Sequence, residues 1–143
     1  TGCSSGQGMM LACNTMPGVL CGYTPTPQDA YLFVQINDGN AVSLPLGLNY
    51  GWAGQINLNH TLEALFLEPF GNGYPKQEAE RKMRDTARLK EIRRLSQIGM
   101  KELLEKLDAE LLQKVLTRKN VTDFIIENGS NEALVEWIRE KCI

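Results

Sequence analysis

The chain has 143 residues, of which 43% are hydrophobic and 22% are charged, and its formal net charge is −2. These values are typical of one globular domain, with or without an appendage, and they exclude a strongly basic nucleic-acid coat and an acidic solvating tail. The charge is unevenly distributed, because all 15 lysines and arginines fall in residues 76–143. No apolar run approaches the roughly 18 residues that a membrane-spanning helix needs.

Residues 1–30 are rich in glycine, serine, threonine and proline, which predicts an extended N-terminal arm. Pro25 and Pro27 favour an extended path over a helix. The initial stretch "TGCSSGQG" is glycine-rich, but it lacks the lysine of a phosphate-binding loop and no strand is expected before it. The first residue, Thr1, fits removal of an initiator methionine, cleavage of a leader or a trimmed chain, and the sequence does not decide among these origins.

Residues 31–74 have the composition of a β part. The stretch "YLFVQI" that begins it is β-branched and aromatic, and Asp38-Gly39 after it is a strong hairpin signal. The stretch "AVSLPL" then predicts the return strand. Residues 61–67 fit a strand or a helix, and the turn residues that follow favour a strand. We therefore expect a small, mostly antiparallel sheet in the N-terminal half.

Residues 75–143 are predicted to be helical, because apolar residues recur there at steps of three and four. Asp108 lies near the apolar stripe and is a good helix cap, so a break at this residue stays open. The expected fold class is therefore α+β, in which the sheet precedes a C-terminal bundle of about four helices. The predicted helices cover residues 76–98, about 100–118, 121–127 and 131–142.

The predicted connector helix 76–98 is basic, and its apolar face changes side near its middle. A helix with a single buried stripe would keep one face, so part of this helix is expected to project from the core. Arginine is the basic residue best suited to interfaces. We predict a protein-binding surface at Arg81, Arg84, Arg88, Arg93 and Arg94. In the alternative interpretation these arginines are solvated and paired with nearby acidic residues.

No catalytic or cofactor signature stands out in the sequence, and we expect no cofactor. Thr1 is a conceivable N-terminal nucleophile, and His60 is the only histidine available to a cysteine–histidine pair, but no motif supports either arrangement. The cysteine spacing matches no common zinc pattern, and low cysteine density favours free thiols, although disulfides stay open. The four cysteines are Cys3, Cys13, Cys21 and Cys142.

The leading hypothesis from the sequence is a non-enzymatic structural or assembly subunit that binds other protein chains in a homo- or hetero-oligomer. The basic-free first half, joined to a helical part, is compatible with a small subunit of a large assembly, such as a virion or phage-particle component. One alternative is a nucleic-acid-associated protein that uses the basic segment 76–94, which is not favoured because the segment has no aromatic residue for base stacking. A second alternative is a small secreted or effector enzyme that uses a cysteine or Thr1. A cytoplasmic location, or a place inside a particle, is slightly favoured over secretion.

Overall fold

The computed structural model describes residues 1–142, and the chain divides into two compact units, Thr1–Ser96 and Gln97–Ile143. The division follows helix α4 and does not coincide with the change in charge near residue 75. The elements of the first unit are β1 (Gly2–Cys3), α1 (Gln7–Thr15), β2 (Cys21–Tyr23), α2 (Pro27–Leu32), the π-helical turn η1 (Phe33–Asn37), β3 (Ala41–Pro45), α3 (Gly54–Leu65), the 3₁₀ turn η2 (Lys76–Glu78) and α4 (Ala79–Ser96).

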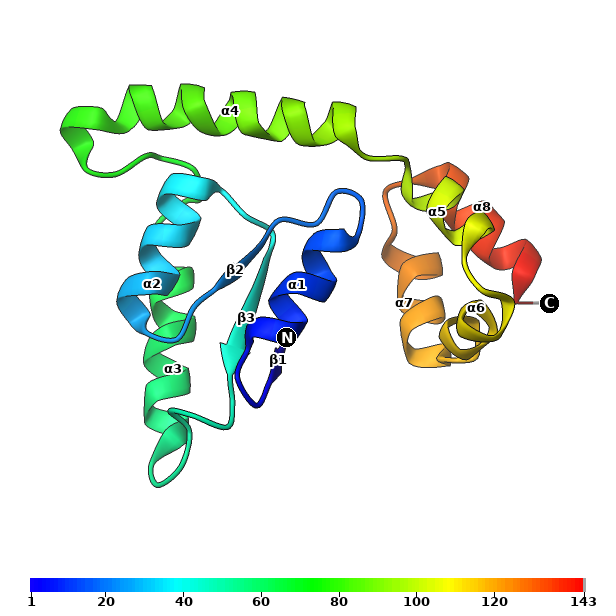
Figure 1. Cartoon of the computed structure of the whole chain (residues 1–143), viewed down its shortest axis with the longest axis horizontal. Helices are drawn as coiled ribbons and strands as arrows, with labels where there is room; N and C mark the ends of the chain where they lie inside the picture. The colour runs from blue at the N-terminus through cyan, green and yellow to red at the C-terminus, as the bar shows by residue number, and fades with distance from the viewer. Residues whose placement is uncertain (143) are drawn as a thin grey trace. The chain divides into compact units, whose positions relative to one another are not determined.

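The first unit is built on a three-stranded parallel sheet with the strand order β1-β3-β2. Helix α1 covers one face of the sheet, and α2 and α3 cover the other (Figure 1). The central strand pairs Leu44 with Gly2 and Ser43 with Tyr23. The antiparallel sheet that we expected is therefore wrong, because helices connect the strands and return the chain to the same edge before each new strand.

The hydrophobic stretch "YLFVQI" forms the end of α2 and the turn η1, where we expected a strand. Thr26 caps this helix by accepting a hydrogen bond at 3.2 Å from a backbone amide of the first turn, and Pro27 takes the first helical position, where no N–H is needed. Asp38 ends the helix with a left-handed backbone (φ 48°) and does not form a hairpin. The apolar residues Ala30 and Val34 are buried on one side of the helix, which outweighs the strand propensity of the stretch "YLFVQI".

Two other segments differ from expectation. Residues 1–30, expected to be an extended arm, contain β1, α1 and β2, because both strands pair with the central strand. Residues 61–67, for which we favoured a strand, are helical as far as Leu65, the last residue of α3. Leu65 is buried against α2. This packing between α2 and α3 favours a helix over a strand in residues 61–65.

The carbonyl groups of η1 are bound by the segment that leads into α4 and by α4 itself. Three successive oxygens accept hydrogen bonds, and the pairs are Gly71 N to Val34 O (2.9 Å), Gly73 N to Gln35 O (2.8 Å) and Thr86 Oγ1 to Ile36 O (2.6 Å). Lys90, one turn further along α4, forms an ion pair with Asp38. Because no residue of α4 is buried, this helix is held on the first unit by polar contacts and not by an apolar stripe.

Over residues 97–142, the second unit has four helices. They are α5 (Met100–Lys106), α6 (Ala109–Leu116), α7 (Lys119–Asn128) and α8 (Glu132–Lys141). Asp108 separates the first two by capping α6, with its carboxylate accepting from the Leu111 amide at 3.0 Å. Leu116, Trp137 and Ile138 form the centre of the core. Within residues 1–142, none of the helices combines the length and the apolar composition that a bilayer crossing demands.

We predict that Trp137→Ala destabilises the second unit by about 3–5 kcal/mol, because Trp137 is only 6% exposed and fills the centre of its core. Phe124→Ala is the matched control, since this aromatic side chain on α7 is 66% exposed. Urea unfolding followed by circular dichroism measures both variants. Equal destabilisation by the two changes would contradict this description of the core.

Candidate functional site

The junction between β1 and α1 gathers the features of a reactive site. Cys3 is the last residue of β1, and therefore lies at the carboxyl end of the parallel sheet, where ligands bind in open α/β folds. The loop that follows turns into α1 at Gly6, whose φ of 75° is left-handed. A Cβ atom at Gly6 would lie 2.7 Å from the Tyr23 ring, so this turn requires glycine.

The carbonyl groups of this loop are bound by the chain that continues from β3. The Cys3 carbonyl accepts a hydrogen bond from the Leu46 amide, and the Ser4 carbonyl accepts one from the Gly47 amide, both at 2.9 Å. A Cβ atom at Gly47 would lie 2.9 Å from the Ser4 oxygen, so the two segments approach too closely for a larger residue. The backbone of the loop is thereby fixed with these oxygens directed toward the sheet.

The amide groups of the same loop stabilise the thiolate of Cys3. Hydrogen bonds from the Met9 amide, and then from the amides of Gly6 and Ser5, lower the pKa of the Cys3 thiol, and the Ser5 side chain adds to this effect. Burial opposes the shift only in part, since Cys3 is partly exposed. The thiol also lies beside the N-terminal end of α1, a position at which helices favour negative charge.

The environment of Cys3 sets it apart from a buried cysteine of the same unit. Cys21 on β2 is 5% exposed, and burial, with a further contribution from the neighbouring Cys13 thiol, raises its pKa to about 11. All four cysteines are free thiols. Because the thiolate is the reactive form, Cys3 can take a proton from a bound molecule or attack it, whereas Cys21 stays protonated near neutral pH.

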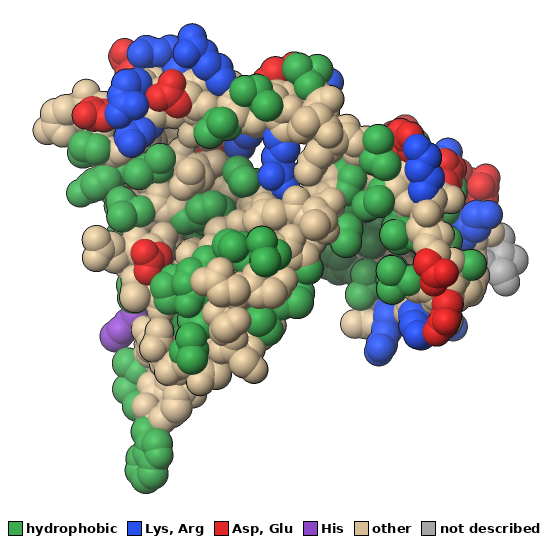
Figure 2. All heavy atoms as spheres, in the orientation of Figure 1, with side chains coloured by type: hydrophobic (Ala, Val, Ile, Leu, Met, Phe, Trp, Pro, Cys, Tyr) green, Lys and Arg blue, Asp and Glu red, His purple; other side chains and the backbone are tan. Residues whose placement is uncertain are grey.

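The structure disperses the arginines that the sequence singled out. Arg81 pairs with Glu78 of η2 and with Asp85, and Arg94 pairs with Glu91 within α4. These pairs lower the pKa of the Glu78 and Glu91 carboxyl groups. Figure 2 shows the basic side chains that gather over α4.

Arg93 lies on the inner side of α4 and is used within the unit. Its guanidinium donates hydrogen bonds to the carbonyl oxygens of Asn14, at 2.9 Å, and Val19. Arg93 is therefore not available to the predicted protein-binding surface. Arg84 and Arg88 are exposed and, within residues 1–142, have no ion-pair partner.

The other candidates from the sequence also have a definite place. The amino group of Thr1 donates a hydrogen bond to the Val42 carbonyl at 3.0 Å, which is a structural contact of the sheet edge. His60 is exposed on α3. Sequence reasoning considered Cys3 only as one of the cysteines that could pair with His60 and placed it in no site. The stretch "TGCSSGQG" nevertheless carried a signal, because a small-residue turn that follows a cysteine is the form of a strand-to-helix loop with exposed amide groups.

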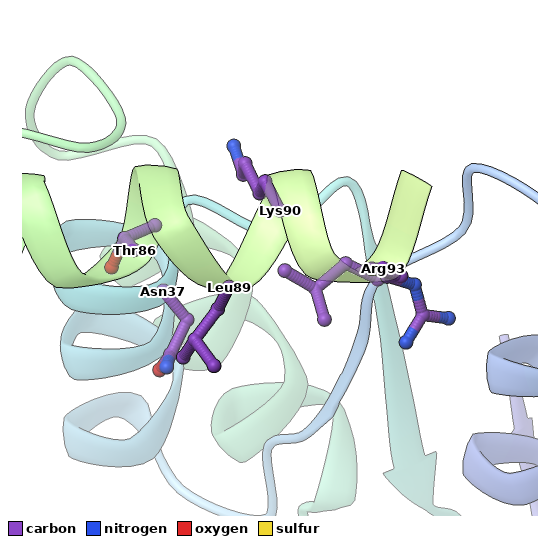
Figure 3. Close-up of a pocket in the computed structure, with 6 residues that line it drawn as sticks. Asn37, Thr86, Leu89, Lys90 and Arg93 are labelled. Carbon is purple, nitrogen blue, oxygen red and sulfur yellow. The ribbon is translucent and has the colours of Figure 1, made fainter. Parts of the chain in front are cut away.

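A pocket of about 230 Å³ lies beneath α4, but both of its charged side chains are bound to other parts of the unit. Figure 3 shows Leu89 and Asn37 projecting into this space and the Lys90 amino group pointing away from it. Lys90 is paired with Asp38, and the Arg93 guanidinium is bound to backbone carbonyls. The β1–α1 junction is therefore the stronger candidate site.

We predict that iodoacetamide alkylates Cys3 in the folded protein at a lower pH than it alkylates the same cysteine in urea, because folding lowers the pKa of this thiol. Cys21 is the internal control and should stay protected up to high pH, since its pKa is about 11. Mass spectrometry of peptic peptides separates the two sites, as trypsin cannot cut before Lys76. An unchanged or higher midpoint for folded Cys3 would contradict the proposed stabilisation of the thiolate.

Comparison with known proteins supplies the family. A model of the family described as Ribose/Galactose Isomerase matches residues 1–92. One similar solved structure is that of 4-deoxy-L-threo-5-hexosulose-uronate ketol-isomerase, complexed with a tartrate. Its sequence is 36% identical to this chain, and the two structures superpose with a TM-score of 0.92. The match covers 98% of this chain and 66% of that chain. Ribose-5-phosphate isomerase from Vibrio parahaemolyticus is 34% identical with a TM-score of 0.91, over the same shares of each chain. No match was found among curated proteins.

These findings overturn the functional hypotheses drawn from the sequence. A structural or virion subunit and a nucleic-acid-associated protein are wrong, because both the family and the similar solved structures are sugar isomerases. The remaining hypothesis, a small secreted or effector enzyme that uses a cysteine or Thr1, agrees with these findings only in expecting an enzyme and did not identify the family. The parallel sheet agrees with this assignment. The present chain spans 66% of the length of the two solved relatives. It belongs to the Ribose/Galactose Isomerase family.

Proposed function

We propose that this protein catalyses the interconversion of an aldose and a ketose, with the Cys3 thiolate as the base that moves the proton. The observation that carries the proposal is the lowered pKa of a partly exposed thiol at the carboxyl end of a parallel sheet. A base of this kind is most effective when its pKa lies near the working pH. The names of the family and of both solved relatives describe the same class of reaction.

The proposed reaction needs one side chain of the protein, which removes a proton and later returns it. An aldose and its ketose differ by the position of one proton on adjacent carbons and one proton on their oxygens. The Cys3 thiolate takes the carbon-bound proton next to the carbonyl group, which gives a thiol and an enediolate. Within the enediolate the hydroxyl proton passes to the former carbonyl oxygen, which turns the former hydroxyl oxygen into the new carbonyl oxygen. The thiol then returns its proton to the former carbonyl carbon, and the thiolate is restored. The amides of Gly6 and Met9 hold the negative charge on sulfur before the step and after it.

We base the proposed substrate class on the names of the two solved relatives. One relative is named for ribose 5-phosphate and the other for a deoxy-hexosulose uronate. Both compounds are anionic sugars with a carbonyl group, so we propose an anionic sugar of five or six carbons as substrate. The two named compounds are therefore the first to be tested.

We predict that Cys3→Ser lowers kcat for the active sugar by about 10²- to 10⁴-fold, the usual contribution of a positioned general base. Cys13→Ser, on α1 of the same unit, is the matched control and should retain activity. Turnover in D₂O with detection of deuterium on the product carbon by NMR measures proton transfer directly. Activity retained in Cys3→Ser would reject Cys3 as the base.

We also propose that the outward face of α4 binds another protein chain through Arg84 and Arg88. Three observations support this surface: α4 buries none of its residues, both arginines lack an ion-pair partner within residues 1–142, and the neighbouring Ile92 and Leu95 are 60% and 71% exposed. Exposed apolar residues beside free arginines are typical of protein interfaces.

We predict that the double change Arg84→Gln and Arg88→Gln weakens the association between chains in solution. The loss of affinity should be greatest at low salt, where electrostatic attraction is least screened. The stability of the free chain should change by less than about 1 kcal/mol, because both side chains are exposed. Lys114→Gln with Lys119→Gln, on the second unit, is a control for the loss of two charges. Sedimentation velocity at two salt concentrations compares them, and equal behaviour would exclude this surface.

A further inference from the structure

The hydroxyl group of Ser43 lies directly behind the loop that carries the reactive thiol. Ser43 is in the central strand β3 and has an exposure of 0%. Its Oγ donates a hydrogen bond to the Gly6 carbonyl oxygen at 2.6 Å. This is a short contact between segments 37 residues apart in the sequence, and it joins the strand to the start of α1.

Gly6 is the point at which the loop becomes a helix, and it has no side chain with which to cap that helix. As the N-terminal cap of α1 it makes no side-chain hydrogen bond, and its carbonyl accepts the first helical bond from the Met10 amide at 3.1 Å. The left-handed backbone of Gly6 depends on its surroundings, which are the Tyr23 ring and the Ser43 hydroxyl. Both come from strands of the sheet.

The orientation of the Gly6 carbonyl bears on the environment of the thiol. The amide of Gly6 is among the groups that lower the pKa of Cys3, and the Met9 amide, the largest contributor, lies in the first turn that Gly6 opens. A rotation of the backbone at Gly6 would therefore turn these amides away from the sulfur atom. Ser43 opposes such a rotation because it holds the oxygen on the opposite side of the loop.

We infer that Ser43 is a positioning residue, which acts through Gly6 to keep the backbone amides aimed at the Cys3 thiolate. The inference deepens the proposed isomerase function and rests on it for its catalytic consequence. Its structural part concerns only the thiol. The Gly6 carbonyl already has a helical partner in Met10, so its hydrogen-bonding need does not by itself require the Ser43 hydroxyl.

The test removes only this hydroxyl group. Ser43→Ala should raise the pH at which iodoacetamide half-maximally alkylates Cys3 by on the order of half a unit, because the charged form loses hydrogen bonds. It should lower kcat about tenfold with little change in KM, the size of effect seen when an outer positioning group is lost. Mass spectrometry of the peptide that contains Cys3 reports the alkylation, independently of any substrate.

The matched control is Thr61→Val, which deletes another fully buried hydroxyl of the same unit. Thr61 donates to the Asn57 carbonyl within α3 at 2.8 Å and makes no contact with the loop in its hydrogen bonds. The control should lose a similar amount of thermal stability and leave the alkylation midpoint of Cys3 unchanged. Circular dichroism first establishes that each variant is folded.

The outcomes separate the inference from the proposed function. A midpoint in Ser43→Ala equal to that of Thr61→Val overturns the inference, even if activity falls. A raised midpoint in a protein that isomerises neither sugar supports the positioning role and rejects the proposed function. If Ser43→Ala does not fold, Ser43→Cys replaces it, since a thiol is a weaker donor of similar shape and should shift the midpoint in the same direction. An unshifted midpoint in that variant also overturns the inference.

Discussion

The hydrogen bonds of the central strand β3 are the constraint on which the first unit depends. On one side β3 pairs with β1, and on the other it pairs with β2, so it alone joins the N-terminal residues to the rest of the sheet. Its continuation binds the carbonyls of Cys3 and Ser4, and its Ser43 side chain binds the carbonyl of Gly6. Because these three carbonyl oxygens are held on the side of the sheet, the amide groups of the loop point toward the Cys3 sulfur atom. The same strand therefore builds the fold and sets the reactivity of the thiol.

The basic helix α4 depends on a second set of polar contacts. Its inner side reaches the end of η1 through Thr86. It reaches the end of α1 and the connection to β2 through Arg93, which binds the carbonyls of Asn14 and Val19. Asn14 itself bridges α1 and β2, since its side chain accepts from the Cys21 amide at 3.0 Å and donates to the Cys21 carbonyl at 2.8 Å. The change of apolar face along α4 follows from this arrangement. A helix held by hydroxyl, ammonium and guanidinium groups needs no continuous apolar stripe, and its remaining apolar residues stay exposed.

Backbone geometry, more than residue type, determines which cysteine of the first unit has a reactive thiol. Cys3 and Cys21 lie on the two outer strands of one small sheet, yet their pKa values move in opposite directions. Amide groups at a helix start stabilise the charge of the first, and an apolar interior opposes the charge of the second. Such a division places one reactive thiol at the edge where substrates of α/β proteins bind, and keeps the other inert.

The sequence by itself determined the features that are encoded locally. The steps of three and four in the C-terminal third correspond to the helices of the second unit, Asp108 caps a helix where its spacing allowed a break, and "AVSLP" is a strand. Only the tertiary structure decided the parallel pairing and the site. A strand as short as Gly2–Cys3 has no periodicity that a pattern can detect, and it exists because β3 pairs with it. The stretch "YLFVQI" is helical because Ala30 and Val34 pack against α3, a contact between residues far apart in the sequence. Cys3 became recognisable as a reactive group for the same reason: the amides around it are aimed by hydrogen bonds from residues about 40 positions away, and no local pattern records them.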